Sequence, residues 1–206
     1  MSDSTNTPQE TPDQSTEQGF DSLCGNLLLA LPGLSDPFFS QTVTFICEHN
    51  SEGAMGLVIN QPTSVDLNEV FEQLAFESTN HEAGERSIGY GGPVSKDRGF
   101  ILHLETDKTN NWSSSLQITE DIWVTTSTDI IEAIAKGRGP EKWLFVLGYA
   151  GWGAGQLESE LAGDSWITIE ANNELVFDTP ATKLLESAAM RLGIELGRLG
   201  SASGTA

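Results

Sequence analysis

Residues 42–62 carry the pattern that most restricts the fold of this chain, TVTFICEHNSEGAMGLVINQP. Two runs of alternating apolar residues flank a short polar segment at positions 50–53, and side chains that alternate along a strand share one of its faces. The pattern predicts a β-hairpin with its turn at the polar segment. Six side chains of the two arms are then expected in the core: Val43, Phe45, Cys47, Met55, Leu57 and Ile59.

Other segments predict strands and helices that interleave without strict βαβ order. Apolar runs predict strands over residues 23–31, 143–147, 166–170 and 175–177, two short strands within residues 87–105, and a second hairpin within residues 115–125. Helical periodicity and capping residues predict helices that begin after Asp66, after Ser127 or Thr128, near Gln156 and at Pro180, with a loop over residues 79–85. At 206 residues the chain can bury one sizeable core, so a single α+β domain is expected.

Both ends of the chain differ from the middle in composition. Residues 1–20 are rich in Ser, Thr, Gln, Pro and acidic side chains and show no apolar periodicity, which predicts a disordered acidic tail. Residues 197–206 are small and polar and are expected to form a loose tail. The folded domain is therefore expected over residues 21–196.

The negative charge of the chain limits its partners. Thirty Asp and Glu against ten Lys and Arg give a formal net charge of −20, whereas nucleic-acid binding takes its sequence-independent affinity from clustered Lys and Arg. The sequence has no helix-turn-helix pattern with a basic recognition helix. Nucleic acid is therefore a disfavoured partner, and direct DNA-binding regulation is kept only as a third hypothesis.

Cysteine usage and hydropathy favour a cytoplasmic protein. The only two cysteines, Cys24 and Cys47, lie in apolar strand-like runs without metal-ligand spacing, so both are expected to be buried, reduced thiols, and no metal or cofactor is expected. The first residues lack the basic and apolar regions of a secretory signal, and no run is long enough to cross a bilayer.

Polar residues at the ends of the hairpin strands are the first candidates for a functional site. Glu48, His49 and Asn60 lie where the apolar runs end. Cys47 and His49 are two positions apart, so they would project to the same face of a strand, which permits a thiol–imidazole pair. Their Cα atoms would be about 7 Å apart, and a buried core thiol is favoured over a nucleophile. His103, at the end of another apolar run, is likewise favoured as a structural histidine over a general base.

A glycine-rich segment offers a second chemistry. Glycines at positions 148, 151, 153 and 155 follow a predicted strand and precede a predicted helix, a context in which backbone amides can cradle phosphate. The segment lacks Gly-Lys-Ser/Thr and does not fit the GxGxxG pattern, so a structural turn that needs small residues is favoured.

Four separated motifs occur together in the order that a known family shows. Their residues are 45–50 with 53–62, then 91–93 with 97–103, then 148–152 with 155–160, and finally Trp166. On these motifs the chain resembles the bacterial AlgH/YqgE family, from about Leu23 to Ile194. The acidic N-terminal extension and the ending Ser201–Ala206 depart from the family pattern.

The resemblance implies a compact single-domain α+β fold. In this fold a bifurcated or two-part, largely antiparallel β-sheet is surrounded by helices, in a cytoplasmic protein to which no molecular activity is assigned. Some members of the family carry the label of transcriptional regulator. The net charge of −20 disfavours direct DNA binding, which leaves indirect regulation through protein contacts.

The leading hypothesis is a binding or regulatory protein that acts through an unidentified protein partner or a small molecule. Its surface would be formed by polar and aromatic residues in turns and at strand ends, outside the apolar periodicities. Three segments supply the candidates: Glu48, His49 and Asn60; Gly91, Gly92, Pro93 and Arg98; and Tyr149, Trp152, Gln156 and Glu158. The alternative is an enzyme or a nucleotide-binding protein that uses Cys47, His49 or the segment Gly148–Gly155.

Overall fold

The predicted hairpin of residues 42–62 is the centre of one half of the fold. In the computed structural model, which describes residues 21–34, 36–105 and 112–195, β2 (Val43–Asn50) pairs with β3 (Gly53–Val58) in antiparallel register. Every residue of β2 from Val43 to Cys47 is buried, because both faces of the sheet are covered at this point. The hairpin prediction is confirmed.

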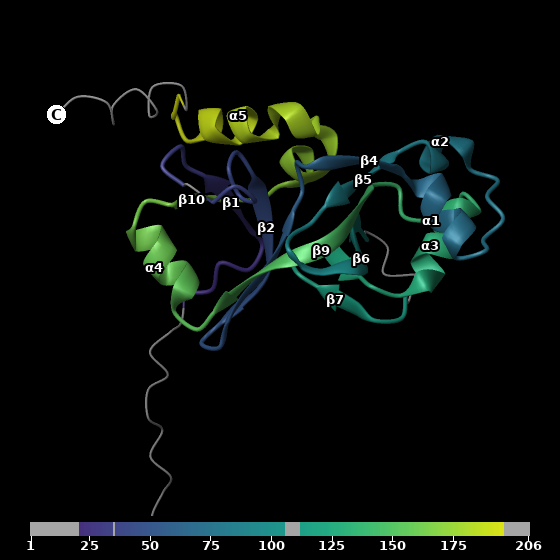
Figure 1. The fold of residues 1–206 in the computed structure, drawn as a ribbon, viewed down its shortest axis with the longest axis horizontal. Helices are drawn as coiled ribbons and strands as arrows, with labels where there is room; N and C mark the ends of the chain where they lie inside the picture. The colour runs from purple at the N-terminus through teal and green to yellow at the C-terminus, as the bar shows by residue number, and fades with distance from the viewer. Residues whose placement is uncertain (1–20, 35, 106–111, 196–206) are drawn as a thin grey trace, which may run out of the picture.

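The remaining strands of the described residues extend this hairpin into a sheet of ten strands (Figure 1). They are β1 (Asn26–Ala30), β4 (Pro62–Asp66), β5 (Ser87–Tyr90), β6 (Val94–Leu104), β7 (Ser115–Gln117), β8 (Ile122–Thr125), β9 (Trp143–Gly153) and β10 (Trp166–Glu170). The order along the sheet is β10-β1-β2-β3-β9-β6-β8-β7, and β5 joins β4 to β9. Among the described strands only β5 and β9 run parallel.

Strand β9 joins the two halves of the sheet. Its first residues pair with β5 and β6, and its last residues, Ala150 to Gly153, pair with β3. One long strand therefore belongs to both halves, and the sheet curls around it (Figure 1). A single α+β domain with a largely antiparallel sheet is confirmed.

Helices cover the sheet in three places (Figure 1). They are α1 (Leu67–Gln73), α2 (His81–Gly84), α3 (Thr128–Ala135), α4 (Gln156–Ala162) and α5 (Ala181–Arg191). Helices α1, α2 and α3 pack together at one end, α4 packs on β9 and β10, and α5 packs on β1. As predicted, Asp66 caps α1, where its side chain accepts a hydrogen bond from the backbone N–H of Glu69 at 3.3 Å.

The curl of the sheet encloses an inner core. Phe45, Leu57, Phe100 and Val146 are among its buried members, and side chains of α5 close it on one side. Separate apolar clusters lie under the helices α1 to α3 and under α4. The side of the inner core that faces away from α5 is open, and the candidate site lies there.

The secondary-structure predictions for residues 79–85 and 175–177 are wrong. Residues 79–85 are not all loop, because α2 forms within them after Asn80, whose side chain accepts from the N–H of Ala83. Residues 175–177 are not a strand but part of a π-helix, η1 (Glu174–Asp178).

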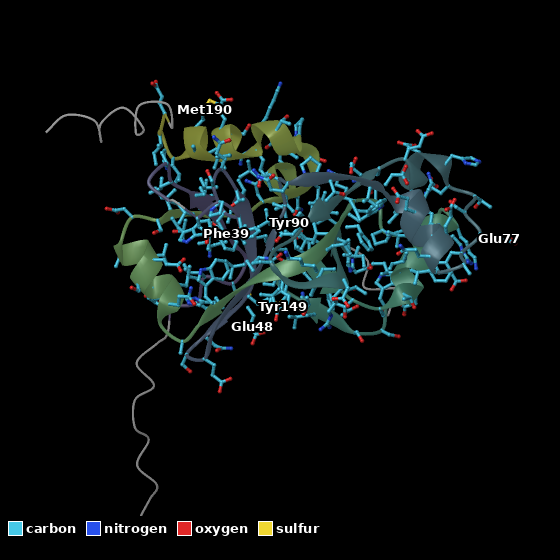
Figure 2. All side chains as sticks on the ribbon, in the orientation of Figure 1. Phe39, Glu48, Glu77, Tyr90, Tyr149 and Met190 are labelled. Carbon is cyan, nitrogen blue, oxygen red and sulfur yellow. The ribbon has the colours of Figure 1, made fainter. Side chains whose placement is uncertain are left out.

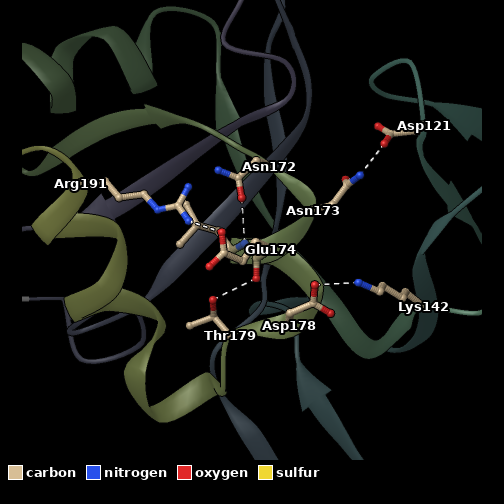
Figure 3. Close-up of polar contacts among 9 residues, drawn as sticks. Asp121, Lys142, Asn172, Asn173, Glu174, Asp178, Thr179 and Arg191 are labelled. Carbon is tan, nitrogen blue, oxygen red and sulfur yellow. Dashed lines mark hydrogen bonds and ion pairs between the residues drawn. The ribbon is translucent and has the colours of Figure 1, made fainter.

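Polar contacts hold η1 in place (Figure 3). Arg191 pairs with Glu174 at 2.7 Å and Lys142 with Asp178 at 2.6 Å. A pattern of apolar residues does not show such long-range partners, so the short run Leu-Val-Phe taken alone predicts a strand.

The two predicted tails, residues 1–20 and 197–206, lie outside the described residues. None of the helices in the described part of the chain is long and apolar enough to span a bilayer.

Candidate functional site

His49 is a buried structural link between the hairpin and α4. Its side chain lies on β2, and the residue is 7% exposed. The backbone N–H of Leu23 donates to His49 Nδ1 at 3.0 Å, and His49 Nε2 lies 3.0 Å from Glu158 Oε1. Because Nδ1 accepts a hydrogen bond, the imidazole proton lies on Nε2, and this N–H donates a hydrogen bond to Glu158.

A β-bulge separates His49 from Cys47. Ile46 pairs with Gly56 and Glu48 pairs with Met55, so Cys47 is an extra residue in the ladder. Cys47 joins the inner core, whereas His49 faces α4. The prediction that the two side chains share a face is therefore wrong, since an inserted residue shifts the alternation of every later side chain.

Glu160 ties α4 to the sheet. The indole N–H groups of Trp152 and Trp166 donate to its Oε2 at 2.9 and 2.8 Å, and Gln156 Nε2 donates to its Oε1 at 2.9 Å. Burial alone would raise the pKa of Glu160, but the three donors outweigh it and the pKa lies below its usual value. Trp152, Gln156 and Glu158, all proposed from the sequence, thus lie in the contact between α4 and the sheet.

Asn60 and the segment 91–93 also make internal contacts. Asn60 Oδ1 accepts from the N–H of Val43 at 2.8 Å, and its Nδ2 donates to the carbonyl of Gln41 at 3.0 Å. The Gly91 N–H donates to the carbonyl of Leu147 at 2.7 Å, and the Gly91 carbonyl accepts from Val58. A Cβ on Gly92, which has φ of +154°, would lie 2.1 Å from the carbonyl carbon of Tyr149, so only glycine fits there.

The glycine-rich segment is not the loop that its composition suggested. Residues 148–153 continue β9, with Gly151 opposite Met55 and Gly153 opposite Gly53. Amides that belong to an antiparallel ladder are not available to cradle a phosphate. Helix α4 begins only after Gly155, and it has seven residues.

A groove opens from the inner core on the side away from α5. In Figure 2 the labelled residues Glu48 and Tyr149 lie near each other below the centre of the view, whereas Met190 of α5 lies at the top. The groove has a volume of about 680 Å³. It is lined by residues of the hairpin and of β6 to β9: Cys47, Glu48, Asn50, Glu52, Gly53, Ala54, Met55, Arg98, Phe100, Ser114, Ser115, Leu116, Val124, Thr126, Tyr149, Gly151 and Trp152.

Apolar side chains form much of this lining. Phe100 and Val124 belong to the inner core, Met55 and Tyr149 pack against it, and Leu116 is 51% exposed. The rings of Phe100 and Tyr149 meet edge to face with centroids 5.8 Å apart. The groove is thus the uncovered end of the core.

Polar residues make up the rest of the lining, and they come from the hairpin and from the residues around Arg98. The Arg98 guanidinium donates to Thr126 Oγ1 at 3.4 Å, and its Cζ lies 5.3 Å from the centroid of the Phe100 ring. On the hairpin side, Glu48 is exposed and its Oε1 accepts from Asn50 Nδ2 at 3.0 Å.

Cys47 lies at the floor of the groove as a protonated thiol. It is 2% exposed. Burial first, and then the nearby Cys24 and Glu48, raise the pKa of Cys47 far above its usual value. A thiol in this state is a poor nucleophile at neutral pH.

The structure thus brings together four of the eleven candidate residues at the groove: Glu48, Arg98, Tyr149 and Trp152. Met55, Phe100, Leu116, Val124 and Thr126 also line the groove, and no motif or strand-end pattern predicts them as site residues. The alternation of apolar residues predicts Met55 in the core, and Leu116 and Val124 fall within the predicted hairpin of residues 115–125, so this apolar alternation is the one signal that points to them. Within the described ranges, no three His, Cys, Asp or Glu side chains are grouped closely enough to hold a metal ion.

Comparison with known proteins agrees with the motifs. A family model described as AlgH-like matches residues 27–197 of the chain. The chain belongs to the AlgH-like family. A UPF0301 protein of Thioalkalivibrio sulfidiphilus is 48% identical over 179 residues, which are 87% of this chain and 94% of that relative. A UPF0301 protein of Saccharophagus degradans is 44% identical over 187 residues, or 91% of this chain and 90% of that relative.

Solved structures show the same fold. The solution structure of the AlgH protein from Pseudomonas aeruginosa has a TM-score of 0.73 and 43% sequence identity, and covers 97% of this chain and 100% of that chain. A crystal structure of a protein from Corynebacterium diphtheriae has a TM-score of 0.68 at 17% identity, covers 85% of this chain and 90% of that chain, and shares the fold alone. The predicted family is confirmed.

Proposed function

We propose that this protein is a cytoplasmic binding protein whose site is the groove at the open end of the inner core. The observation that carries the proposal is the shape and lining of this groove. Small-molecule sites are concave, hold about 300–1,000 Å³, and are mostly apolar with a few placed polar groups. The groove has about 680 Å³ and combines Met55, Phe100 and Leu116 with the polar group of Arg98.

Its position in the fold supports the same proposal. The mouth of a curled or closed sheet is a common place for a ligand, because the sheet supplies rigid walls and the core supplies an apolar floor. Leu116 lies on β7, the last strand of the sheet order, and is 51% exposed. An apolar ligand that covers Leu116 would remove this surface from water.

Two free thiols support the cytoplasmic location. Cys24 and Cys47 are unpaired cysteines, and free thiols are the usual state in a reducing compartment.

The alternative of an enzyme that uses Cys47 or His49 has less support. Cys47 has a raised pKa, and His49 is engaged by Leu23 and Glu158 on the other face of the sheet. A nucleotide-dependent activity at residues 148–155 has less support because most of this segment is a strand.

A groove-filling substitution tests the proposal. Gly151 lines the groove, and a Cβ added there would make only ordinary contacts, the nearest being Tyr149 Cε2 at 3.4 Å. Gly151→Val should therefore fold and reduce the space for a ligand. Gly153→Val is the matched control, because Gly153 lies on the same strand with its nearest Cβ neighbour at 3.9 Å, outside the groove lining.

Binding is measured with Nile red, a neutral dye whose fluorescence rises in apolar surroundings. The wild type and Gly153→Val should bind the dye saturably, and Gly151→Val should bind it at least tenfold more weakly. Melting temperatures measured in parallel show that both variants are folded. Equal dye binding by the two folded variants would contradict the groove as the site.

A further inference from the structure

Arg98 brings to the groove of a strongly acidic protein a positive charge that forms no ion pair with any residue that the structure describes. Among the described residues, the four ion pairs use His49, Lys136, Lys142 and Arg191, and none uses Arg98. Among the described residues, its guanidinium donates one hydrogen bond, to the hydroxyl of Thr126 at 3.4 Å, and lies over the ring of Phe100. Four of its five N–H donors therefore have no acceptor in the described residues.

The surroundings of this charge are apolar on one side and rich in hydroxyl groups on the other. Phe100 lies under the guanidinium, and Ser114 and Thr126 line the groove close to it. Val124 and Leu116, which pair with each other across β8 and β7, line the groove farther along, since Val124 lies opposite Leu102 of β6. A ligand that places an anionic group on the guanidinium and an apolar body on the three side chains would satisfy both parts of the lining.

The opposite edge of the groove carries acidic residues, and these determine how a charged ligand is oriented in the groove. Glu48 and Glu52 belong to the hairpin, and both are exposed. Glu48 already accepts from Asn50, and Glu52 lies in the turn at the hairpin tip. These residues repel an anionic group and direct it to Arg98. The competing possibility is a ligand whose ammonium group binds at the acidic edge.

We infer that the ligand of the groove is a small amphipathic anion, such as an aliphatic or aryl carboxylate, with its carboxylate on Arg98 and its apolar body against Phe100, Leu116 and Val124. This inference rests on the proposed function and gives the chemical class of its ligand. A planar guanidinium is suited to a carboxylate because it can form two parallel hydrogen bonds.

Matched probes of equal chain length test the ligand class. Octanoate, octan-1-ol and octylammonium are compared as competitors of bound Nile red on the full chain. Octanoate should displace the dye at a concentration at least tenfold lower than either of the others, because a charge-assisted hydrogen bond is stronger than a neutral one. Hexanoate should be weaker than octanoate by roughly fourfold for each methylene removed.

Two charge variants locate the anion. Arg98→Gln should weaken displacement by octanoate about tenfold or more and leave octan-1-ol unchanged. Lys96→Gln is the control, because it removes the same charge from the same strand at a position that does not line the groove. Octanoate should bind that variant within about twofold of the wild type.

The outcomes separate the two proposals. Equal displacement by octanoate and octan-1-ol, with binding still lost in Gly151→Val, would overturn the anionic ligand and keep the groove. Stronger displacement by octylammonium than by octanoate would overturn the anionic ligand and indicate a cationic ligand at the acidic edge. Dye binding that is insensitive to Gly151→Val would overturn the groove itself, whatever the competitor.

Discussion

The imidazole Nε2 of His49 lies 3.0 Å from the Oε1 of Glu158, so two residues 109 positions apart join β2 to α4. The second ring nitrogen accepts from the N–H of Leu23. One buried side chain therefore connects three segments: the start of the domain, the hairpin and the helix that follows β9.

Replacement of His49 should destabilise the protein, because it removes the buried Nδ1 that accepts a hydrogen bond from Leu23. His49→Ala leaves the Leu23 N–H without its acceptor and should lower the free energy of unfolding by about 1–3 kcal/mol in urea titrations. His49→Asn keeps an acceptor near the position of Nδ1 and should lose less. Glu158→Gln should cost under about 1 kcal/mol, because the Glu158 side chain is 44% exposed. Equal losses in His49→Ala and His49→Asn would refute the role of Nδ1.

The Glu160 carboxylate should make the protein sensitive to acid. The pKa of Glu160 is lowered in the folded state by the N–H groups of Trp166, Gln156 and Trp152, against the effect of burial. The ionised carboxylate therefore stabilises the folded state fully above the pKa of Glu in the unfolded chain, about 4.3. This stabilisation is lost as the pH falls through the lower pKa of the folded state. In urea titrations, Glu160→Gln should be less stable than the wild type by about 1–3 kcal/mol at neutral pH.

The pH dependence provides the control for this prediction. The difference between the wild type and Glu160→Gln should shrink as the pH falls below about 4.3. Glu186→Gln changes an exposed position of α5, and its difference from the wild type should stay near zero. A Glu160→Gln difference that is constant with pH would show that the carboxylate charge contributes nothing.

Cys47 should resist alkylation in the native protein. In a Cys24→Ser variant, Cys47 is the only remaining thiol. Its burial and raised pKa predict that iodoacetamide modifies it at least tenfold more slowly in the native state than in urea, as followed by mass spectrometry. Equal rates in the two states would restore Cys47 as a candidate nucleophile.

Gly92 should tolerate no side chain. Gly92→Ala places a methyl group against the backbone of Tyr149 and should destabilise the protein by more than about 3 kcal/mol, measured as a fall in the urea midpoint. Gly137→Ala is the matched control: φ is +65° there and no atom lies near the added Cβ, so the cost is about 1–2 kcal/mol. Similar losses in both variants would exclude the contact with Tyr149 as the cause.

Local patterns predicted much of the fold. Asp66 caps α1, the runs at residues 143–147 and 166–170 are strands, and the hairpin of residues 42–62 lies where it was expected. These elements depend on neighbouring residues, whose periodicity and capping are visible in the chain itself.

The candidate site could be predicted only in part. Glu48, Arg98, Tyr149 and Trp152 line one groove, but His49 lies on the other face of the sheet. The extra residue at Cys47 reversed the expected faces, and no apolar pattern reveals a β-bulge.

The family, the α+β class and most of the buried strands can be predicted from the chain alone, because they follow from motifs and from the alternation of apolar side chains. The three-dimensional arrangement is needed to see that the glycine-rich segment continues β9 and that Leu116 remains exposed at the groove that Arg98 also lines. This difference arises from the curl of the sheet. It brings β7 and the hairpin tip to one open end of the core, and this proximity depends on strand pairing between residues far apart in the chain.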